Sequence, residues 1–276
     1  MTPLKKILFI FVFLFLLFSV GLALYFRIEH IHLSQIQKVT VEERKVGFEK
    51  VLKFNQQAIF VLAKDYSYWD ELVDAIKNED LQWSWVNIDS GIKTYNADAA
   101  WTYNVDFKKI YSVNRFGDER LKNLPFNIEQ VQKIFSGQSL VHFYVETPAG
   151  YLEVQGATVH PSNDSERKTP PQGYFFVGKL WDKEYLESLS QLIDCKISVI
   201  SANDIGDIKI KDHVFVVSMR GWDNAPLFNI LGSVDSRVLE NFHRESRSFL
   251  KMFMIYTSLQ MLVLLYFLRR FLKRTV

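Results

Sequence analysis

Two long apolar segments, one near each end, constrain this chain more than any other feature. Residues 7–26 are 20 residues without a charge, and at about 1.5 Å of rise per residue such a helix matches the roughly 30 Å hydrocarbon core of a membrane. Residues 252–268 form a second run of 17 residues with only three polar side chains. Both runs predict transmembrane helices. A cleaved signal peptide is the alternative for the first run, but signal cores are usually shorter, about 7–15 residues.

Basic residues are concentrated beside these segments. Seven of the 33 Lys and Arg residues lie outside 27–250, beside the two runs, where there is no acid, so residues 27–250 carry 26 basic against 31 acidic residues. Lys5 and Lys6 precede the first run, and Arg269 and Arg270 follow the second. Because flanking cations favour the cytoplasmic side, we expect both termini in the cytoplasm and the acidic middle outside. The middle has no basic stripe, which argues against a nucleic-acid partner.

Between the runs, the hydrophobic period changes from that of helices to that of strands. Residues 28–64 contain one glycine and no proline, which favours a long helix leaving the membrane. From Trp101 onward, apolar and polar residues alternate as in strands, with a hairpin turn at residues 148–150. Residues 174–177 are apolar on both faces, as in a central strand. The sequence predicts an α+β domain with a long N-terminal helix and a central antiparallel sheet, between two transmembrane helices.

The predicted boundaries follow from these patterns. They are a cytoplasmic tip and first transmembrane helix over 1–27, an extracytoplasmic domain over 28–250 (stalk 28–64, body about 65–236, return helix 237–250), and a second transmembrane helix with a basic tail over 251–276. The stalk carries a partial apolar stripe that the domain cannot cover on both flanks, so we expect a parallel homodimer along 28–60.

Candidate site residues gather around an aromatic and acidic stretch. Its apolar residues recur at helical spacing and predict one continuous buried helix face: Leu62, Tyr66, Trp69, Val73 and Ile76. We expect Trp69 to form a wall of a ligand cavity. Since a carboxylate beside an apolar wall is costly unless paired, Asp70 should meet a donor on the ligand or on Tyr103 or Tyr144. The alternatives are that Asp70 pairs only within the protein, capping or bracing a neighbouring loop such as 87–89, or that it lies on a solvated helix face.

The complete set of predicted ligand-binding residues includes His160, at the end of a strand and the mouth of the expected pocket. The set is Tyr66, Trp69, Asp70, Asp89, Tyr103, Tyr144 and His160. The Asp-Ser-Gly sequence at 89–91 predicts a turn before the first strand.

The sequence offers little for catalysis or metal binding. It has no phosphate-binding loop and no Cys or His pair at metal-ligand spacing. Asp70 and Asp74 could share an ion, but no third ligand is near. The single cysteine, Cys195, fits a small buried hydrophobic residue. We therefore expect no catalytic residue, no metal and no cofactor.

Three segments together resemble a known family. They are residues 65–72 with Trp69 and Asp70 at their centre, the segment 87–89, and the glycine-containing strand 173–179. This combination, with the order of elements over about 45–200, resembles the fourth type of CHASE extracellular sensor domain, which is similar to PAS-like Cache sensors.

The resemblance implies a two-span receptor of the bacterial inner (cell) membrane, with a periplasmic or extracellular sensor domain ahead of a histidine kinase or a cyclic-di-nucleotide cyclase module. It implies that the domain detects a small ligand, whose identity the sequence does not give. Because this chain ends eight residues beyond Leu268, the output module is either left off or carried by a separate cytoplasmic partner. The alternative from another class is a membrane-anchored assembly protein whose external domain grips another protein.

Overall fold

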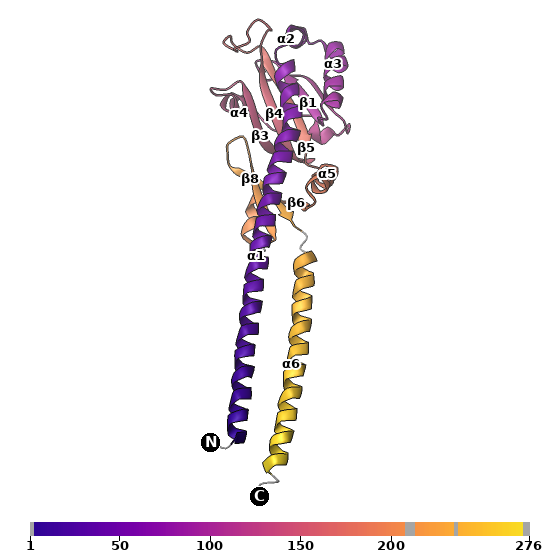
Figure 1. Cartoon of the computed structure of the whole chain (residues 1–276). Coiled ribbons are helices and arrows are strands. Elements are labelled where there is room, and N and C mark those ends of the chain that lie inside the picture. Colours follow the sequence, from indigo (N-terminus) through magenta and orange to yellow (C-terminus); the bar gives the residue numbers. More distant parts are fainter. Residues whose placement is uncertain (1–2, 208–212, 235–236, 273–276) are drawn as a thin grey trace. The chain divides into compact units, whose positions relative to one another are not determined.

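The computed structural model describes residues 3–207, 213–234 and 237–272 and divides into two compact units (Figure 1). One consists of Met1–Val39 with Asp235–Val276, and the other of Thr40–Val234. Helix α1 (Pro3–Tyr66) begins in the first unit and ends in the second. The first unit also contains α6 (Arg237–Leu272).

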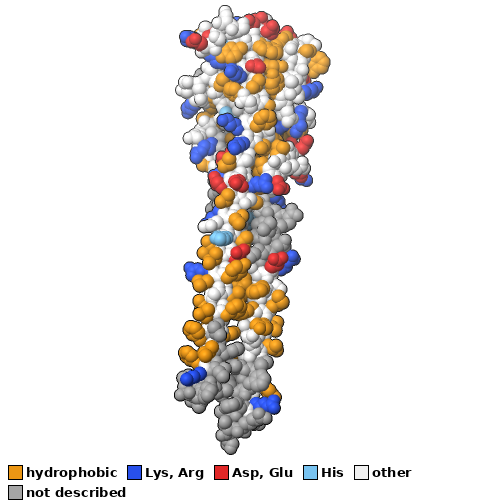
Figure 2. All heavy atoms as spheres, viewed as in Figure 1, with side chains coloured by type: hydrophobic (Ala, Val, Ile, Leu, Met, Phe, Trp, Pro, Cys, Tyr) orange, Lys and Arg blue, Asp and Glu red, His pale blue; other side chains and the backbone are white. Residues whose placement is uncertain are grey.

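The two helices of the first unit pack against each other through aromatic rings. The ring centroids of Phe18 and Phe253 lie 5.9 Å apart, and those of Phe26 and Phe249 lie 5.8 Å apart. Hydrophobic side chains cover much of the described surface of both helices (Figure 2). Within the described side chains, α1 has the length and hydropathy of a membrane-spanning helix; the second predicted run, on α6, includes side chains outside that description.

The second unit is built on a five-stranded antiparallel sheet with the order β2-β1-β5-β4-β3. Its strands are β1 (Ala99–Tyr103), β2 (Lys109–Asn114), β3 (Leu140–Thr147), β4 (Gly150–Val159) and β5 (Gly173–Leu180). The predicted hairpin at residues 148–150 and the central position of residues 174–177 are both confirmed. β5 is central because its side chains are buried on both faces of the sheet.

Different helices cover the two faces of this sheet. One face packs against α4 (Ile128–Ile134) and the short 3-10 helix η1 (Glu119–Leu121), and we call this core the α4 cluster. The other face packs against the C-terminal part of α1, α2 (Asp70–Asn78) and α3 (Leu81–Thr94), and we call this core the α2/α3 cluster.

A second sheet adds a third core. It has three antiparallel strands in the order β6-β8-β7, namely β6 (Lys196–Ser201), β7 (Val214–Arg220) and β8 (Pro226–Ser233), with η2 (Ala202–Asp207) after β6. These strands pack with α5 (Lys183–Ile193) and with Phe48 and Leu52 of α1, and we call this core the α5 cluster. The prediction of an α+β fold with a long N-terminal helix is confirmed, but the later strands form this separate sheet and do not extend the central one.

The predicted continuous helix face over 62–76 is wrong in one respect. α1 ends at Tyr66 and α2 begins at Asp70, with Trp69 extended at the N-cap position. The Tyr68 and Trp69 amides bond to carbonyls three residues back, which tightens and ends α1. The apolar spacing continues across this break because both helices bury the same face in the α2/α3 cluster.

The predicted turn at 89–91 is also wrong, because these residues lie inside α3. Asp80 caps that helix by accepting a hydrogen bond from the Trp83 amide. Gly91 serves packing: a Cβ at this position would lie 2.8 Å from the Tyr66 hydroxyl oxygen. The glycine thus allows α3 to approach α1 closely.

Candidate functional site

A band of polar side chains crosses the sheet face that α1 covers. Glu153 on β4 and Lys179 on β5 are paired in the antiparallel register, and only 1% and 8% of their surfaces are exposed. Along β5, Lys179 stands between Val177 of the α2/α3 cluster and Trp181 of the α5 cluster. The band therefore separates two apolar cores, and buried charges in such a place must be paired or serve a function.

Lys179 is fully engaged within the protein. Its ammonium nitrogen lies 2.9 Å from the Asn96 carbonyl oxygen, 3.4 Å from Asn96 Oδ1 and 3.2 Å from Asp98 Oδ1. Asp98 also accepts from Arg115 Nε at 2.7 Å and from the Leu180 amide at 2.8 Å. Burial raises the pKa of Asp98, while the two cations and the amide oppose the rise. The three donors of Lys179 are all used, so it is a structural cation.

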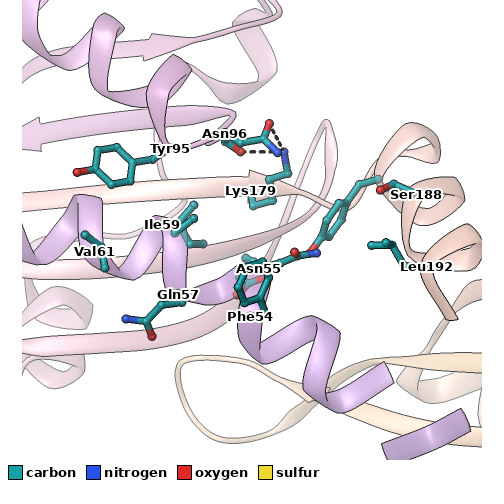
Figure 3. A pocket seen from close by; sticks show the side chains of 13 residues that line it. Phe54, Asn55, Gln57, Ile59, Val61, Tyr95, Asn96, Lys179, Ser188 and Leu192 are labelled. Carbon is teal, nitrogen blue, oxygen red and sulfur yellow. Dashed lines mark hydrogen bonds between the residues drawn. The ribbon is translucent and has the colours of Figure 1, made fainter. Parts of the chain in front are cut away.

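A cleft of about 470 Å³ opens between α1, α5 and this part of the sheet (Figure 3). Its volume lies within the range of roughly 300–1,000 Å³ typical of small-molecule sites. Seven of its thirteen lining residues are apolar or aromatic and six are polar or charged: Phe54, Asn55, Gln57, Ala58, Ile59, Val61, Tyr95, Asn96, Glu153, Lys179, Tyr185, Ser188 and Leu192.

Glu153 is the least satisfied charge in this lining. Its Oε1 lies 2.9 Å from His142 Nε2 on the neighbouring strand β3. Within the described residues, no hydrogen-bond donor is recorded for its second oxygen, Oε2. Burial, and to a lesser extent the negative charge of Glu153, raises the pKa of Tyr185, which lines the same cleft. Asn55 Nδ2 donates to the Tyr185 hydroxyl at 3.4 Å, which leaves the Asn55 amide oxygen as an acceptor.

The family model of the CHASE4 domain matches residues 51–199, which is more than half of the chain. The chain belongs to the CHASE4 domain family. The predicted family is thus confirmed. CHASE4 domains are extracellular sensor domains of signalling receptors, so this region is the sensor part of such a receptor.

Two solved structures are similar in fold to this CHASE4 chain. The crystal structure of the periplasmic domain of Vibrio cholerae LuxQ is 10% identical, with 70% of this chain and 98% of that one covered at a TM-score of 0.48. A selenomethionine structure of the same LuxQ domain is 10% identical, with 69% and 95% covered at a TM-score of 0.45. Among curated proteins, none matches this sequence significantly.

None of the seven predicted site residues lines the cleft described above. Tyr66 and Trp69 stack on each other with ring centroids 4.2 Å apart, and Tyr66 also stacks on Phe175 of β5. Trp69 is 37% exposed, so it forms an outer edge of the α2/α3 cluster. The two residues do lie together, as predicted, but at the corner between α1 and α2.

Asp70 has a definite partner, as we expected for a carboxylate beside an apolar wall, but the partner is not one of those predicted. Its carboxylate accepts hydrogen bonds from the Ser162 amide at 2.8 Å and the Ser162 hydroxyl at 2.5 Å. These bonds lower the pKa of Asp70. The expected pairing with Tyr103 or Tyr144 is therefore wrong. Asp70 does brace a neighbouring loop, as the alternative predicted, but this is the loop after β4 and not the segment 87–89.

The other predicted residues are dispersed over the CHASE4 domain. Asp89 on α3 accepts from the Tyr111 hydroxyl at 2.6 Å. Tyr103 lies on the opposite face of the sheet, in the α4 cluster, where burial raises its pKa to about 12. Tyr144 lies in the α5 cluster and accepts from Gln56 Nε2 at 2.9 Å. A common ligand site for all seven residues has no geometric support here.

His160 belongs to a hydrogen-bonded loop after β4. Its ring nitrogens lie 2.9 Å from Thr158 Oγ1 and 3.1 Å from Asp164 Oδ2. Burial lowers the pKa of His160, and hydrogen bonds from the Thr169 hydroxyl and nearby amides hold the pKa of Asp164 well below its usual range. Arg167 from this loop donates to Ser67 Oγ at 2.6 Å, so the loop is fastened to the corner between α1 and α2.

The sequence did contain one signal for the cleft residues that was missed. Glu153 and Lys179 are the charged residues of β4 and β5, and each is flanked by buried neighbours. Such a residue in a central strand needs a partner or a function. Only the strand register shows that the two lie side by side.

Proposed function

We propose that this CHASE4 chain is the sensor part of a bacterial membrane receptor and that it binds a small ligand in the cleft between α1, α5 and the five-stranded sheet. The cleft itself carries the proposal, because it combines apolar walls with buried charges at its base. A protein that only grips another protein needs an apolar surface patch and no ligand-sized cleft, so the cleft favours the receptor, although it is not bounded by Trp69 and Asp70. The PAS- or Cache-like character of the domain is part of this proposal.

We further propose that the receptor has two membrane spans, at residues 7–26 and 252–268, with both termini cytoplasmic. The apolar side chains exposed on α1 and α6 support this, since lipid would cover them. The basic residues beside both runs support the orientation. α1 supports transmission, because the helix that lines the cleft at 54–61 is the same helix that contains residues 7–26.

We propose that two copies pair along the stalk and that these 276 residues have no catalytic activity. The stalk exposes a series of large apolar side chains at Ile28, Ile31, Ile36, Val39 and Val46, which a second copy could cover. A histidine kinase or diguanylate cyclase type of module, on a continuation of the chain or on a cytoplasmic partner, would then supply the output.

Alkaline phosphatase fusions test the proposed topology. A fusion after residue 160 should be active, because the enzyme would be exported, and a fusion after Val276 should be inactive. An inactive fusion at 160 with an active fusion at Val276 would place the CHASE4 domain in the cytoplasm and refute the receptor.

A further inference from the structure

The two charged residues of the cleft, Lys179 and Glu153, differ in how many of their hydrogen-bonding groups are already used. Lys179 uses its donors on Asn96 and Asp98, and Figure 3 shows its side chain turned toward Asn96. Glu153 has only His142 on one oxygen. Among the described residues, no Lys or Arg forms an ion pair with Glu153. The cleft therefore offers an incoming molecule an unpaired acceptor and no free cation.

A buried carboxylate in this state favours one kind of partner. Glu153 is only 1% exposed, so leaving its second oxygen without a donor is costly, and a positively charged donor relieves that cost better than a neutral one. An anionic ligand would meet the charge of Glu153, and the one cation of the lining, Lys179, already donates to Asn96 and Asp98, so carboxylates and phosphates fit the cleft poorly.

The other lining residues indicate the chemistry of the part of the ligand that does not contact Glu153. Phe54 and Leu192 are 79% and 62% exposed and stand on two sides of the cleft, on α1 and α5. Ile59 and Val61 add apolar surface along α1. Asn55, whose Nδ2 is bonded to Tyr185, can accept a second hydrogen bond through its amide oxygen.

We propose that the cleft binds a small organic ammonium ion with an apolar body. The ammonium group donates to Glu153 Oε2 and to the Asn55 amide oxygen, and the apolar body lies against Phe54, Val61 and Leu192. This inference rests on the proposed function and specifies the ligand class of the same site. It assigns Lys179 to the structure of the cleft and Glu153 to recognition.

Three probes of matched size test the ligand class. The full-length chain in nanodiscs of neutral lipid is titrated calorimetrically with 2-phenylethylammonium, 2-phenylethanol and 3-phenylpropionate, and empty nanodiscs correct for partition into lipid. The ammonium ion should bind, and the alcohol and the carboxylate should bind at least about ten-fold more weakly. Equal binding of the alcohol, stronger binding of the carboxylate, or no binding of the ammonium ion at millimolar concentration would overturn the proposal.

The variant Glu153→Gln tests whether the Glu153 carboxylate attracts the ammonium probe, and Glu187→Gln on α5 is its control. Gln keeps the size and a hydrogen bond to His142 but removes the charge, so affinity for the ammonium probe should fall about ten-fold or more. Glu187 is exposed and does not line the cleft, so its variant should stay within about two-fold of wild type. Equal effects of the two variants would assign the attraction to general surface charge and overturn the proposal.

The melting temperature without ligand separates recognition from structure. Because Glu153→Gln removes a poorly compensated buried charge, the ligand-free variant should melt at or above the wild-type temperature. A large fall would make Glu153 a structural partner of His142. Ala58→Phe gives an independent variant that fills the cleft without touching a charge, and it should also abolish binding of the ammonium probe. If Ala58→Phe still binds the ammonium probe, the probe binds at a site other than the cleft, and the proposal is overturned.

The phosphatase fusions are independent of these titrations. An active fusion after residue 160 together with failed ammonium binding would keep the receptor and refute only its ligand class.

Discussion

Replacing Asp98 should cost the CHASE4 domain a large part of its stability. Asp98 is fully buried and serves three donors: Lys179 Nζ, Arg115 Nε and the Leu180 amide. In Asp98→Asn, Arg115 can turn to Asp182, which already lies 3.7 Å away. Among its present acceptors, Lys179 would keep only the neutral oxygens of Asn96, since the structure shows no bond between it and its cross-strand neighbour Glu153.

The magnitude follows from the ammonium left without a counter-charge. Breaking a buried ion pair by removing one partner costs about 3–5 kcal/mol, against a total stability of about 5–15 kcal/mol for a typical domain. For a domain of this size, 1 kcal/mol corresponds to about 2–4 °C, so the melting temperature should fall by about 6–20 °C. Urea denaturation of a fragment spanning residues 40–234, followed by far-UV circular dichroism, measures the change.

A double variant and an exposed control make the test specific. Asp98→Asn combined with Lys179→Met removes the orphaned charge and should recover at least half of the loss, so the double variant should be more stable than the sum of the two single variants predicts. Glu119→Gln breaks the exposed pair with Lys122 and should change stability by less than about 0.5 kcal/mol. If Asp98→Asn costs less than about 1 kcal/mol, Lys179 is not held by this pair and is free to bind a ligand.

Three further predictions concern other parts of the chain. Asp70→Asn should lower the melting temperature modestly by weakening its bonds to Ser162, with unchanged probe binding; loss of probe binding at an unchanged melting temperature would restore Asp70 as a ligand contact. Because burial lowers the pKa of His160, the unfolded state binds more protons than the folded state once the pH falls to about 6.5, so stability should decline as the pH drops below about 7. The low pKa of Asp164 adds a further loss only below about pH 4, and His160→Gln should flatten the first decline but not the second. Cysteine at Val39 should crosslink two copies in oxidised membranes, and a lack of crosslinks there and over the two adjoining helical turns would refute the stalk dimer.

The strands and their turns could be predicted because their signals are local. Alternating burial in β3, the turn at 148–150 and the doubly apolar β5 all follow from a few adjacent residues. The break between α1 and α2 could not be predicted in the same way. Trp69 is not a typical N-cap residue, and the apolar spacing continues across the break without a change of phase.

The interior role of Gly91 was hidden for a related reason. Asp, Ser and Gly in succession favour a turn, but here the preceding Asp80 caps a helix that runs through all three. What decides the conformation is the Tyr66 hydroxyl, 2.8 Å from where a Cβ would lie, and that contact joins residues 25 positions apart. Tertiary packing overrides local preference at this position.

The candidate cleft was even harder to predict from the sequence, because it is formed by residues far apart in the chain. Its lining comes from α1, the segment after α3, two strands and α5, so no single stretch of sequence describes it. The aromatic and acidic stretch around Trp69 was more conspicuous, and it does identify the family, since the family match includes it. Its side chains, however, bond within the protein at the corner between α1 and α2.

The polar band beneath α1 also bears on how this fold balances stability against function. Asn55 and Gln56 of α1 meet Tyr185 and Tyr144 by hydrogen bonds at the level where the α2/α3 and α5 clusters are separated. Apolar residues at these positions, and at Glu153, would join the two cores and bury more apolar surface. A fold selected for stability alone would take that course. Proteins usually keep such locally unfavourable packing where they bind a ligand or a partner. The polar band is therefore the part of this domain where we expect a functional site.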